Sequence, residues 1–428
     1  MSRSSRTRWT TTARRSALAL PAVLLFVSPA GAVKRRAFAT SVTGSGNLST
    51  WAGATGATAL DRGDSICRAR ATAAGLPNAG TYRVWLSANG TDAYCHVQGL
   101  AGTKSGGCNG AALPGGGPWY LANGVTNFTG TLDQLTGAAG VIYRSVTTDE
   151  FTNDLPDDWT QRRYWTGSRA NGKADSARCS DFTSASGSLQ GLTGDGDASA
   201  IYWTDAFEEN CDQPMRLLCF EPGASDTATL HWSPGAIAFV TSAFGGGELG
   251  AWAQSDGQVS VTAGYHICQN LAAAAFLPVP ASFVPWLSSP LADAVDRLST
   301  DGPFRRVDGY TVASDLAQLT SGAPQNSLHV DEFGHYLTDA NQVEVWTGTF
   351  ADGTREASET CDNWLDGTNA FFGLAGRAPI GHDPDWTEQS GYLCLAQARL
   401  YCFSNSITIF WDGFEITGDA SRWSTHVP

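Results

Sequence analysis

The chain alternates short apolar runs with glycine-rich polar stretches, and the runs have the length of β-strands. Residues 37–42 and 237–244 predict opening strands, and Tyr82–Leu86 predicts another short strand. RLLCF at 216–220 and RLYCF at 399–403 predict closing strands. The chain is therefore expected to hold many short strands joined by loops.

Two segments have the boundary residues of helices. Asp64 or Ser65 can cap a helix that runs to about Ala74, and Gly75 is placed to stop it. A second short helix is expected near Leu132. Helices set among short strands predict an α+β fold, and the 15 Trp and 19 Phe supply enough apolar surface for a core.

The chain repeats itself. Residues 38–87 align without a gap with residues 239–288, and 20 of these 50 positions are identical, against about four expected from composition. The alignment continues at shifted offsets, and its later pairs are LDQLTG with LAQLTSG, YWTGSRANG with VWTGTFADG, and RLLCF with RLYCF. The sequence thus predicts a tandem duplication.

The repeat sets the expected domain bounds. We expect a signal peptide at 1–32, a first domain at 38–221, a linker at 222–238, a second domain at 239–404 and a C-terminal tail at 405–428. The linker is rich in Pro, Gly, Ser and Thr. The tail lies outside both copies, and an edge strand and a surface-sorting element are equal alternatives for it.

The first 32 residues have the features of a secretory signal. Five arginines accompany an apolar stretch at 16–27 that is too short to span a bilayer, and Ala30-Gly31-Ala32 is a small-residue cleavage site. Arg14-Arg15 suggests twin-arginine export, but the residues around the pair fit poorly, which favours Sec export. We expect a secreted or cell-surface protein with no later membrane span.

The charge argues against two classes of partner. Loss of the five signal-peptide arginines changes the formal net charge from −14 to about −19. A negative field of this size repels phosphate backbones and anionic lipids. Nucleic acid is therefore not an expected partner.

The ten cysteines predict disulfides, because an even number on an exported chain is typical of a disulfide framework. Four in the first copy match four in the second: Cys67, Cys179, Cys211 and Cys219 match Cys268, Cys361, Cys394 and Cys402. Cys95 and Cys108 lie in a loop that the second copy lacks, and we expect them to bond to each other. Zinc would need close pairs such as C-x-x-C, which the sequence lacks. The spacing leaves three pairings open for each set of four.

Three motifs, in order, resemble a known family. AGTYRVWLS follows the first helix, YWTGSRANGKADSARCSDF comes in the middle, and CDQPMRLLCFE closes the first copy. These segments are similar to endostatin, the C-terminal domain of certain basement-membrane collagens, and to an uncharacterised bacterial family of exported endostatin-related domains. The resemblance covers about 38–221 and 239–404. It implies a fold distantly related to C-type lectins, with a twisted mixed sheet, helices and long loops.

The resemblance also implies nested disulfides, first Cys to fourth and second to third. Carried over, the pairs are Cys67–Cys219, Cys179–Cys211, Cys268–Cys402 and Cys361–Cys394. Two family properties do not carry over. The first copy has no His before its helix for endostatin's zinc site, and the acidic charge argues against heparin. The Ca²⁺-binding tripeptides of sugar-binding C-type lectins do not occur in the sequence.

Other motifs have plainer explanations. Arg62-Gly63-Asp64 spells an integrin-type tripeptide, but the second copy has Ala263-Gly264-Tyr265 there, so we expect chance or helix capping. His329 and His335 are expected to be solvated loop side chains, because a spacing of six fits no zinc pattern. The tryptophans that recur in both copies are expected to pack in the core, and the pairs are 51/252, 85/286, 165/346 and 203/386.

Two acidic segments could hold Ca²⁺ or could be solvated carboxylates. One contains Asp149, Glu150, Asp154, Asp157 and Asp158, and the other has Asp195 and Asp197 around Gly196. Neither has the EF-hand pattern, so solvated carboxylates are the preferred interpretation.

No catalytic motif marks an active site in the sequence, which has no G-x-S-x-G, H-E-x-x-H, phosphate loop or Rossmann fingerprint. We expect a non-enzymatic binding or adhesion protein that uses no cofactor or metal and binds an extracellular glycan or protein. The alternatives are a structural component of the cell envelope and a hydrolase with an unrecognised site.

Overall fold

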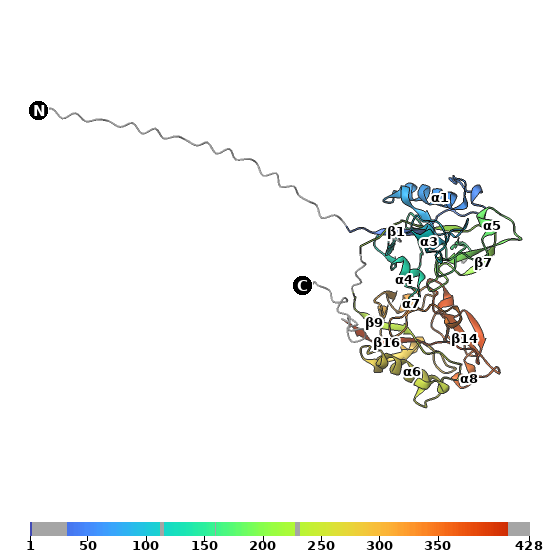
Figure 1. The fold of residues 1–428 in the computed structure, drawn as a ribbon. Coiled ribbons are helices and arrows are strands. Elements are labelled where there is room, and N and C mark those ends of the chain that lie inside the picture. Colours follow the sequence, from blue (N-terminus) through green and yellow to red (C-terminus); the bar gives the residue numbers. More distant parts are fainter. Residues whose placement is uncertain (2–31, 112–114, 159, 227–231, 410–428) are drawn as a thin grey trace. The chain divides into compact units, whose positions relative to one another are not determined.

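The computed structural model describes residue 1 and residues 32–111, 115–158, 160–226 and 232–409 (Figure 1). The described residues from Val33 onward form one compact unit. We call residues 33–226 the first half and 232–409 the second half. The expected signal peptide and most of the expected tail lie outside the described residues.

The strands of the first half form one mixed sheet. Its order is β4-β3-β1-β8-β5-β6-β7, and β2 also pairs with β8. The opening strand β1 is parallel to β3 and antiparallel to the closing strand β8, so the two ends of this half lie side by side at the sheet centre. The strands are β1 (Arg35–Ala39), β2 (Arg83–Val84), β3 (Trp119–Leu121), β4 (Asn127–Thr129), β5 (Arg163–Trp165), β6 (Gln190–Asp195), β7 (Phe207–Asn210) and β8 (Arg216–Phe220).

The strands of the second half follow the same order in two sheets. The orders are β10-β16-β9-β11-β12 and β13-β14-β15, and a parallel bridge between Val345 and Arg399 links β13 to the chain just before β16. The strands are β9 (Gly235–Val240), β10 (Phe283–Pro285), β11 (Phe304–Arg306), β12 (Thr311–Ala313), β13 (Glu344–Trp346), β14 (Phe372–Arg377), β15 (Ser390–Leu393) and β16 (Tyr401–Thr408). The sheets and helices confirm an α+β fold.

Each half has one long helix, and the first begins earlier than predicted. Helix α1 spans Ala59–Ala73, and Thr58 and Asp61 form a capping box at its start. Asp64 is buried in its middle, so the prediction of a cap at Asp64 or Ser65 is wrong. The predicted end is right, because Gly75 follows with a φ of +66°. Helix α6 (Ser260–Ala274) corresponds to α1 at an offset of 201.

Short helical segments complete the fold. The helix expected near Leu132 is α4, which begins there with a capping box from Thr131 and Gln134. The segments are α2 (Ala93–His96), α3 (Gly107–Gly110), α4 (Leu132–Thr136), α5 (Cys179–Phe182), α7 (Leu316–Leu319) and α8 (Cys361–Trp364). All four residues of α5 and of α8 have φ between +46° and +61°, so these two are left-handed turns, one in each half.

Five disulfides bond all ten cysteines. They join the pairs that the resemblance implies and the expected loop pair, namely Cys67–Cys219, Cys95–Cys108, Cys179–Cys211, Cys268–Cys402 and Cys361–Cys394. The bonds Cys67–Cys219 and Cys268–Cys402 each tie the long helix of a half to its closing strand. The cysteines of α5 and α8 anchor the two left-handed turns.

The recurrent tryptophans are buried, as the packing prediction requires. Each of the eight is at most 8% exposed, and Trp85 packs against Trp203 just as Trp286 packs against Trp386. Every helix in the described ranges is too short or too polar to cross a membrane.

Two predicted boundaries differ from the structure. The linker was expected to reach residue 238, but β9 begins at Gly235, and residues 227–231 lie outside the described chain. The tail was expected to begin at 405 outside the domain, but β16 continues to Thr408 and pairs there with Gly235. The closing strand β16 therefore includes the first residues of the expected tail.

Candidate functional site

A buried glutamate holds the corresponding loop in each half. Glu150, which is 1% exposed, accepts hydrogen bonds from the Ser41 N–H over 2.8 Å and from its hydroxyl over 2.6 Å. Glu332, with no exposed surface, accepts from the N–H and hydroxyl of Ser242 in the same way. The prediction of a solvated carboxylate is therefore wrong for Glu150. The glutamates correspond at an offset of 182.

The other acidic side chains divide between core and surface. Asp149 is 6% exposed and accepts the backbone N–H groups of Phe151 and Asn153, so it shapes its own loop. Asp195 and Asp197 are also buried, which contradicts the solvated interpretation for these three. Asp154, Asp157 and Asp158 are exposed as expected. Among the described residues, no three His, Cys, Asp or Glu side chains are grouped to hold a metal ion.

The Arg62-Gly63-Asp64 tripeptide lies inside α1 and not in an exposed loop. Asp64 is 4% exposed and accepts hydrogen bonds from the Val84 N–H over 3.0 Å and from Arg83 over 3.1 Å. Its Oδ1 lies 2.8 Å from His96 Nε2. Asp64 therefore ties the helix to β2 and does not cap the helix.

The two halves contact each other through corresponding loops. Residues 197–199 pair with residues 379–381 around an antiparallel bridge between Ala198 and Ile380. Each loop donates one backbone N–H to a carbonyl of the other, over 2.8 Å and 3.2 Å. The loops correspond at an offset of 182, and each hydrogen bond is the counterpart of the other. A local two-fold axis therefore relates the two sides of this contact.

On one side, aromatic rings and a buried arginine fill the contact; we call this the closed side. Tyr143 stacks on Tyr310 with ring centroids 5.0 Å apart and lies edge-on to Tyr336 at 6.3 Å. Arg306, with no exposed surface, donates to the Tyr143 carbonyl over 2.8 Å and to Asp308 over 2.7 Å. The ring contacts and the bond to the Tyr143 carbonyl cross between the halves, and the ion pair of Arg306 with Asp308 lies within the second half beside them.

His329 also belongs to the closed side. Its Nε2 lies 3.2 Å from the Ile142 carbonyl of the first half, and its Nδ1 lies 2.9 Å from the Ser327 hydroxyl. Burial and the charge of Arg306 lower the pKa of His329 well below its usual value. The prediction of a solvated side chain is wrong here, because the first half covers this loop. The same prediction holds for His335, whose side chain is 77% exposed.

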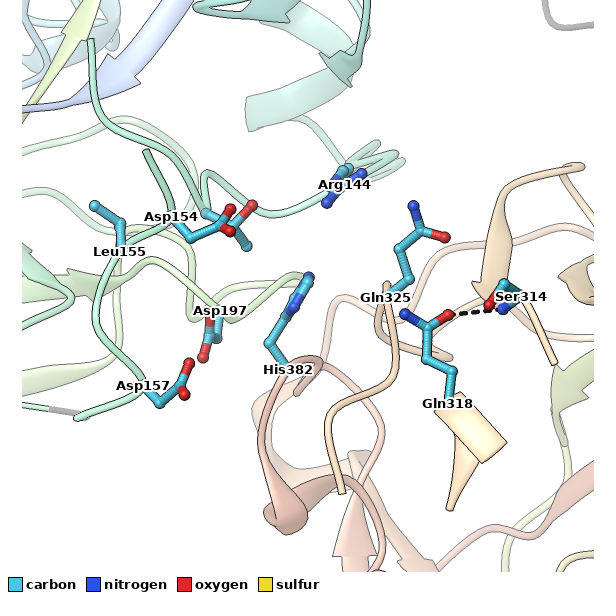
Figure 2. A pocket seen from close by; sticks show the side chains of 10 residues that line it. Arg144, Asp154, Leu155, Asp157, Asp197, Ser314, Gln318, Gln325 and His382 are labelled. Carbon is cyan, nitrogen blue, oxygen red and sulfur yellow. Dashed lines mark hydrogen bonds between the residues drawn. The ribbon is translucent and has the colours of Figure 1, made fainter. Parts of the chain in front are cut away.

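The counterpart of the closed side is a cavity of about 410 Å³, which we call the inter-half cavity (Figure 2). The first half contributes Arg144, Thr147, Asp154, Leu155, Asp157 and Asp197. The second half contributes Ser314, Gln318, Gln325 and His382. In Figure 2, His382 lies between the aspartates of the first half and the two glutamines of the second.

Differences at corresponding positions explain why one side is filled and the other is open. Three of the four rings on the closed side have non-aromatic side chains at the corresponding positions of the cavity wall. At the offset of 182 the pairs are Tyr143 with Gln325, Tyr336 with Asp154, and His329 with Thr147. One corresponding pair differs in the opposite sense, since His382 lines the inter-half cavity and its counterpart Ala200, with φ of +53° against +56°, lines the cavity of about 520 Å³.

Arg162 contacts three carboxylates next to the cavity, one of which lines it. Its Nε donates to Asp195 over 2.8 Å, and its Nη1 donates to Asp383 of the second half over 2.9 Å. The same Nη1 lies 2.9 Å from Asp197 Oδ2. One guanidinium thus faces three carboxylates, and burial raises the pKa of Asp197 well above its usual value against the attraction of Arg162. This network holds Asp197 in the cavity wall and ties the halves together.

Besides Asp197 Oδ2, which forms an ion pair with Arg162, three buried polar atoms on the cavity wall have no hydrogen-bond partner within the described part of the chain: Thr147 Oγ1, Arg144 Nε and His382 Nε2. Thr147 as a whole is 4% exposed. A buried polar atom without a partner costs about 1–3 kcal/mol, so such atoms are rare and call for an explanation. Three of them around one cavity indicate a place where a ligand supplies the partners.

Two other cavities lie among the described residues, with volumes of about 470 and 520 Å³. The first lies between Thr43 and Arg216, and the second lies near Leu135 and Asp205. Within the described ranges, their lining side chains include no buried polar atom without a partner. Volume alone would favour these two, but the chemistry favours the inter-half cavity.

His382 gives the cavity a measurable pH signature. Burial and the nearby Arg144 lower the pKa of His382 from 6.5 to about 4, so the unfolded chain binds this proton more readily than the folded chain. The stabilising effect of a neutral ring is thus complete above pH 6.5 and is lost as the pH falls toward 4. We expect His382→Gln to reduce the dependence of unfolding free energy on pH by about 1.4 kcal/mol per pH unit in this window.

Urea unfolding of both proteins between pH 4 and 7 checks this. The difference between them is the informative quantity, because buried carboxylates with raised pKa values, such as Asp197, change the wild-type slope in the opposite direction. His335→Gln, which removes an exposed histidine outside the cavity wall, is the control variant. Parallel curves for His382→Gln and wild type would contradict the assignment.

The cavity does not present a nucleophile relay in the described residues. Ser314 donates its hydroxyl to the adjacent Asp315, and His382 Nε2 has no partner there. A relay would need the serine hydroxyl within hydrogen-bond reach of the histidine. The arrangement is suited to holding a ligand through hydrogen bonds and charge.

Sequence reasoning missed most of the site. Arg144, Thr147, Gln325 and His382 belong to no motif, and Asp197 was noted as a solvated or Ca²⁺-binding side chain. A comparison of the two repeats could have found these residues, because they lie at positions where the repeats differ. His382, for example, corresponds to Ala200.

Comparison with known proteins adds no assignment. No family model matches the chain. No curated protein matches it either. The functional argument therefore rests on the site itself.

Proposed function

We propose that this is a secreted or cell-surface protein that binds a ligand without transforming it, and that the inter-half cavity is its binding site. The convergence of Thr147 Oγ1, Arg144 Nε and His382 Nε2 on one cavity carries the proposal. A volume of about 410 Å³ is within the ordinary range for small-molecule sites. Five disulfides are typical of proteins outside the cytoplasm, which agrees with an extracellular ligand.

We also propose that the halves are duplicated endostatin-like domains. Their shared strand order, their long helices of 15 residues and the two nested disulfides in each half support this. In this proposal the duplication matters for function, because each half supplies one wall of the cavity. Neither half alone would form the binding site.

The test is to block the cavity from its rim. Ser314 is exposed and lines the cavity, so Ser314→Tyr adds a ring there without disturbing the core. Ala317→Tyr is the matched control, since Ala317 is exposed on the neighbouring α7 and lies outside the cavity wall. We expect the mature chain to bind members of a glycan and protein array, and Ser314→Tyr to weaken those hits at least tenfold while the control retains them.

Two results would contradict the proposal. Hits that survive Ser314→Tyr would place the binding surface elsewhere on the molecule. A mature chain that gives no reproducible hit on either array would favour a structural component of the envelope.

A further inference from the structure

The unpartnered atoms define what the ligand must offer. The ring of His382 bonds to the backbone of Gln325, and because Nε2 has no partner, Nδ1 makes that bond. A lowered pKa keeps the ring neutral, and the bond to Gln325 favours the protonated ring, so Nδ1 donates its proton to the backbone and Nε2 is left to accept. Thr147 Oγ1 can donate or accept, and Arg144 Nε donates. A ligand must therefore donate a hydrogen bond to His382 and accept one from Arg144. Hydroxyl groups can do both, so a polyol fits these requirements.

The charges at the mouth define a second requirement. Asp154 and Asp157 line the cavity and are exposed, and within the described chain neither carboxylate forms an ion pair, although Arg144 attracts Asp154 at longer range. Arg162 is already matched by three carboxylates, which leaves Arg144 as the cation of the wall. The wall therefore carries excess negative charge, which attracts a cation and repels an anion.

We propose that the inter-half cavity binds an amino sugar, a hydroxyl-rich ring that carries a protonated primary amine. This inference rests on the proposed function of the cavity and specifies its ligand. The ammonium group lies at the mouth beside Asp154 and Asp157. The hydroxyl groups lie deeper, where one donates to His382 Nε2 and another bonds to Thr147 Oγ1. Leu155 offers an apolar contact for the C–H face of the ring.

Three sugars with the same ring separate charge from shape. Calorimetry would compare glucosamine, N-acetylglucosamine and glucuronate, which are cationic, neutral and anionic near pH 7. We expect glucosamine to bind at least tenfold more tightly than N-acetylglucosamine, glucuronate to show no binding, and the preference to weaken as salt screens the carboxylates.

Variants at the mouth complete the test. Asp154→Asn and Asp157→Asn should each reduce the preference for glucosamine, and the double variant should abolish it. Asp158→Asn is the matched control, because Asp158 is an exposed neighbour whose carboxylate caps its own turn and lies outside the cavity wall. It should keep the preference intact.

The outcomes distinguish this inference from the proposed function. Equal affinity for the neutral sugar, tighter binding of glucuronate, or no binding of any of the three would overturn the amino-sugar inference. In each of these cases, array hits that Ser314→Tyr still weakens would leave the cavity as the binding site. Glucosamine binding that persists in Ser314→Tyr would overturn both.

Discussion

Replacing Cys67 and Cys219 with alanine is expected to lower the free energy of unfolding by about 5 kcal/mol. The bond joins residues 152 apart in sequence, so its loss frees a long loop in the unfolded chain. The same calculation gives about 3 kcal/mol for Cys95 and Cys108, which are only 13 apart. Guanidinium unfolding of the two double variants and the wild type, without reductant, measures the difference.

The order of the two losses is the informative result. Both bonds lie in the first half, so the comparison holds the rest of the domain constant. Equal losses, or a larger loss for the short loop, would show that native contacts and not loop length set the contribution of these bonds.

Arg306→Leu should have the largest effect of any single substitution at the contact between the halves, a loss of about 3–5 kcal/mol. The change leaves Asp308, whose side chain is 8% exposed, without its cation. It also removes the donor to the Tyr143 carbonyl across the contact. Urea unfolding followed by tryptophan fluorescence measures the loss.

Two further variants show whether the buried charge is the cause. Arg305→Leu changes a half-buried neighbour that bonds within the second half, and it should cost much less. Adding Asp308→Asn to Arg306→Leu removes the unpaired charge and should recover part of the loss. An Arg306→Leu protein as stable as Arg305→Leu would mean that the closed side does not depend on this ion pair.

Local signals predicted the strands better than the helix start. RLLCF at 216–220 coincides with β8, because a short apolar run between turns has few alternatives. The start of α1 was misplaced because Asp64 has the side chain of a cap, while Thr58 and Asp61 make the actual capping box. Asp64 lies in the helix because its carboxylate binds Arg83 and the backbone of β2, contacts that sequence spacing does not reveal.

The site was less predictable than the fold for a physical reason. Its two walls come from residues 144–197 and 314–382, and the burial of His329 and Asp197 depends on contact between the halves. Reasoning on one repeat at a time treats these loops as surface. Only the contact turns a loop histidine into a buried one and leaves another, His382, facing a cavity.

The two-fold bridge between Ala198 and Ile380 has a consequence for how such a protein can change over generations. In a symmetric dimer of identical chains, every substitution occurs at both symmetry-related positions. An aromatic side chain that fills one side of the contact would therefore fill the other side as well. In a continuous polypeptide, each side is encoded separately. The closed side can evolve as a fixed contact between the halves while the cavity side acquires a new ligand. Selection for ligand binding then need not weaken the contact.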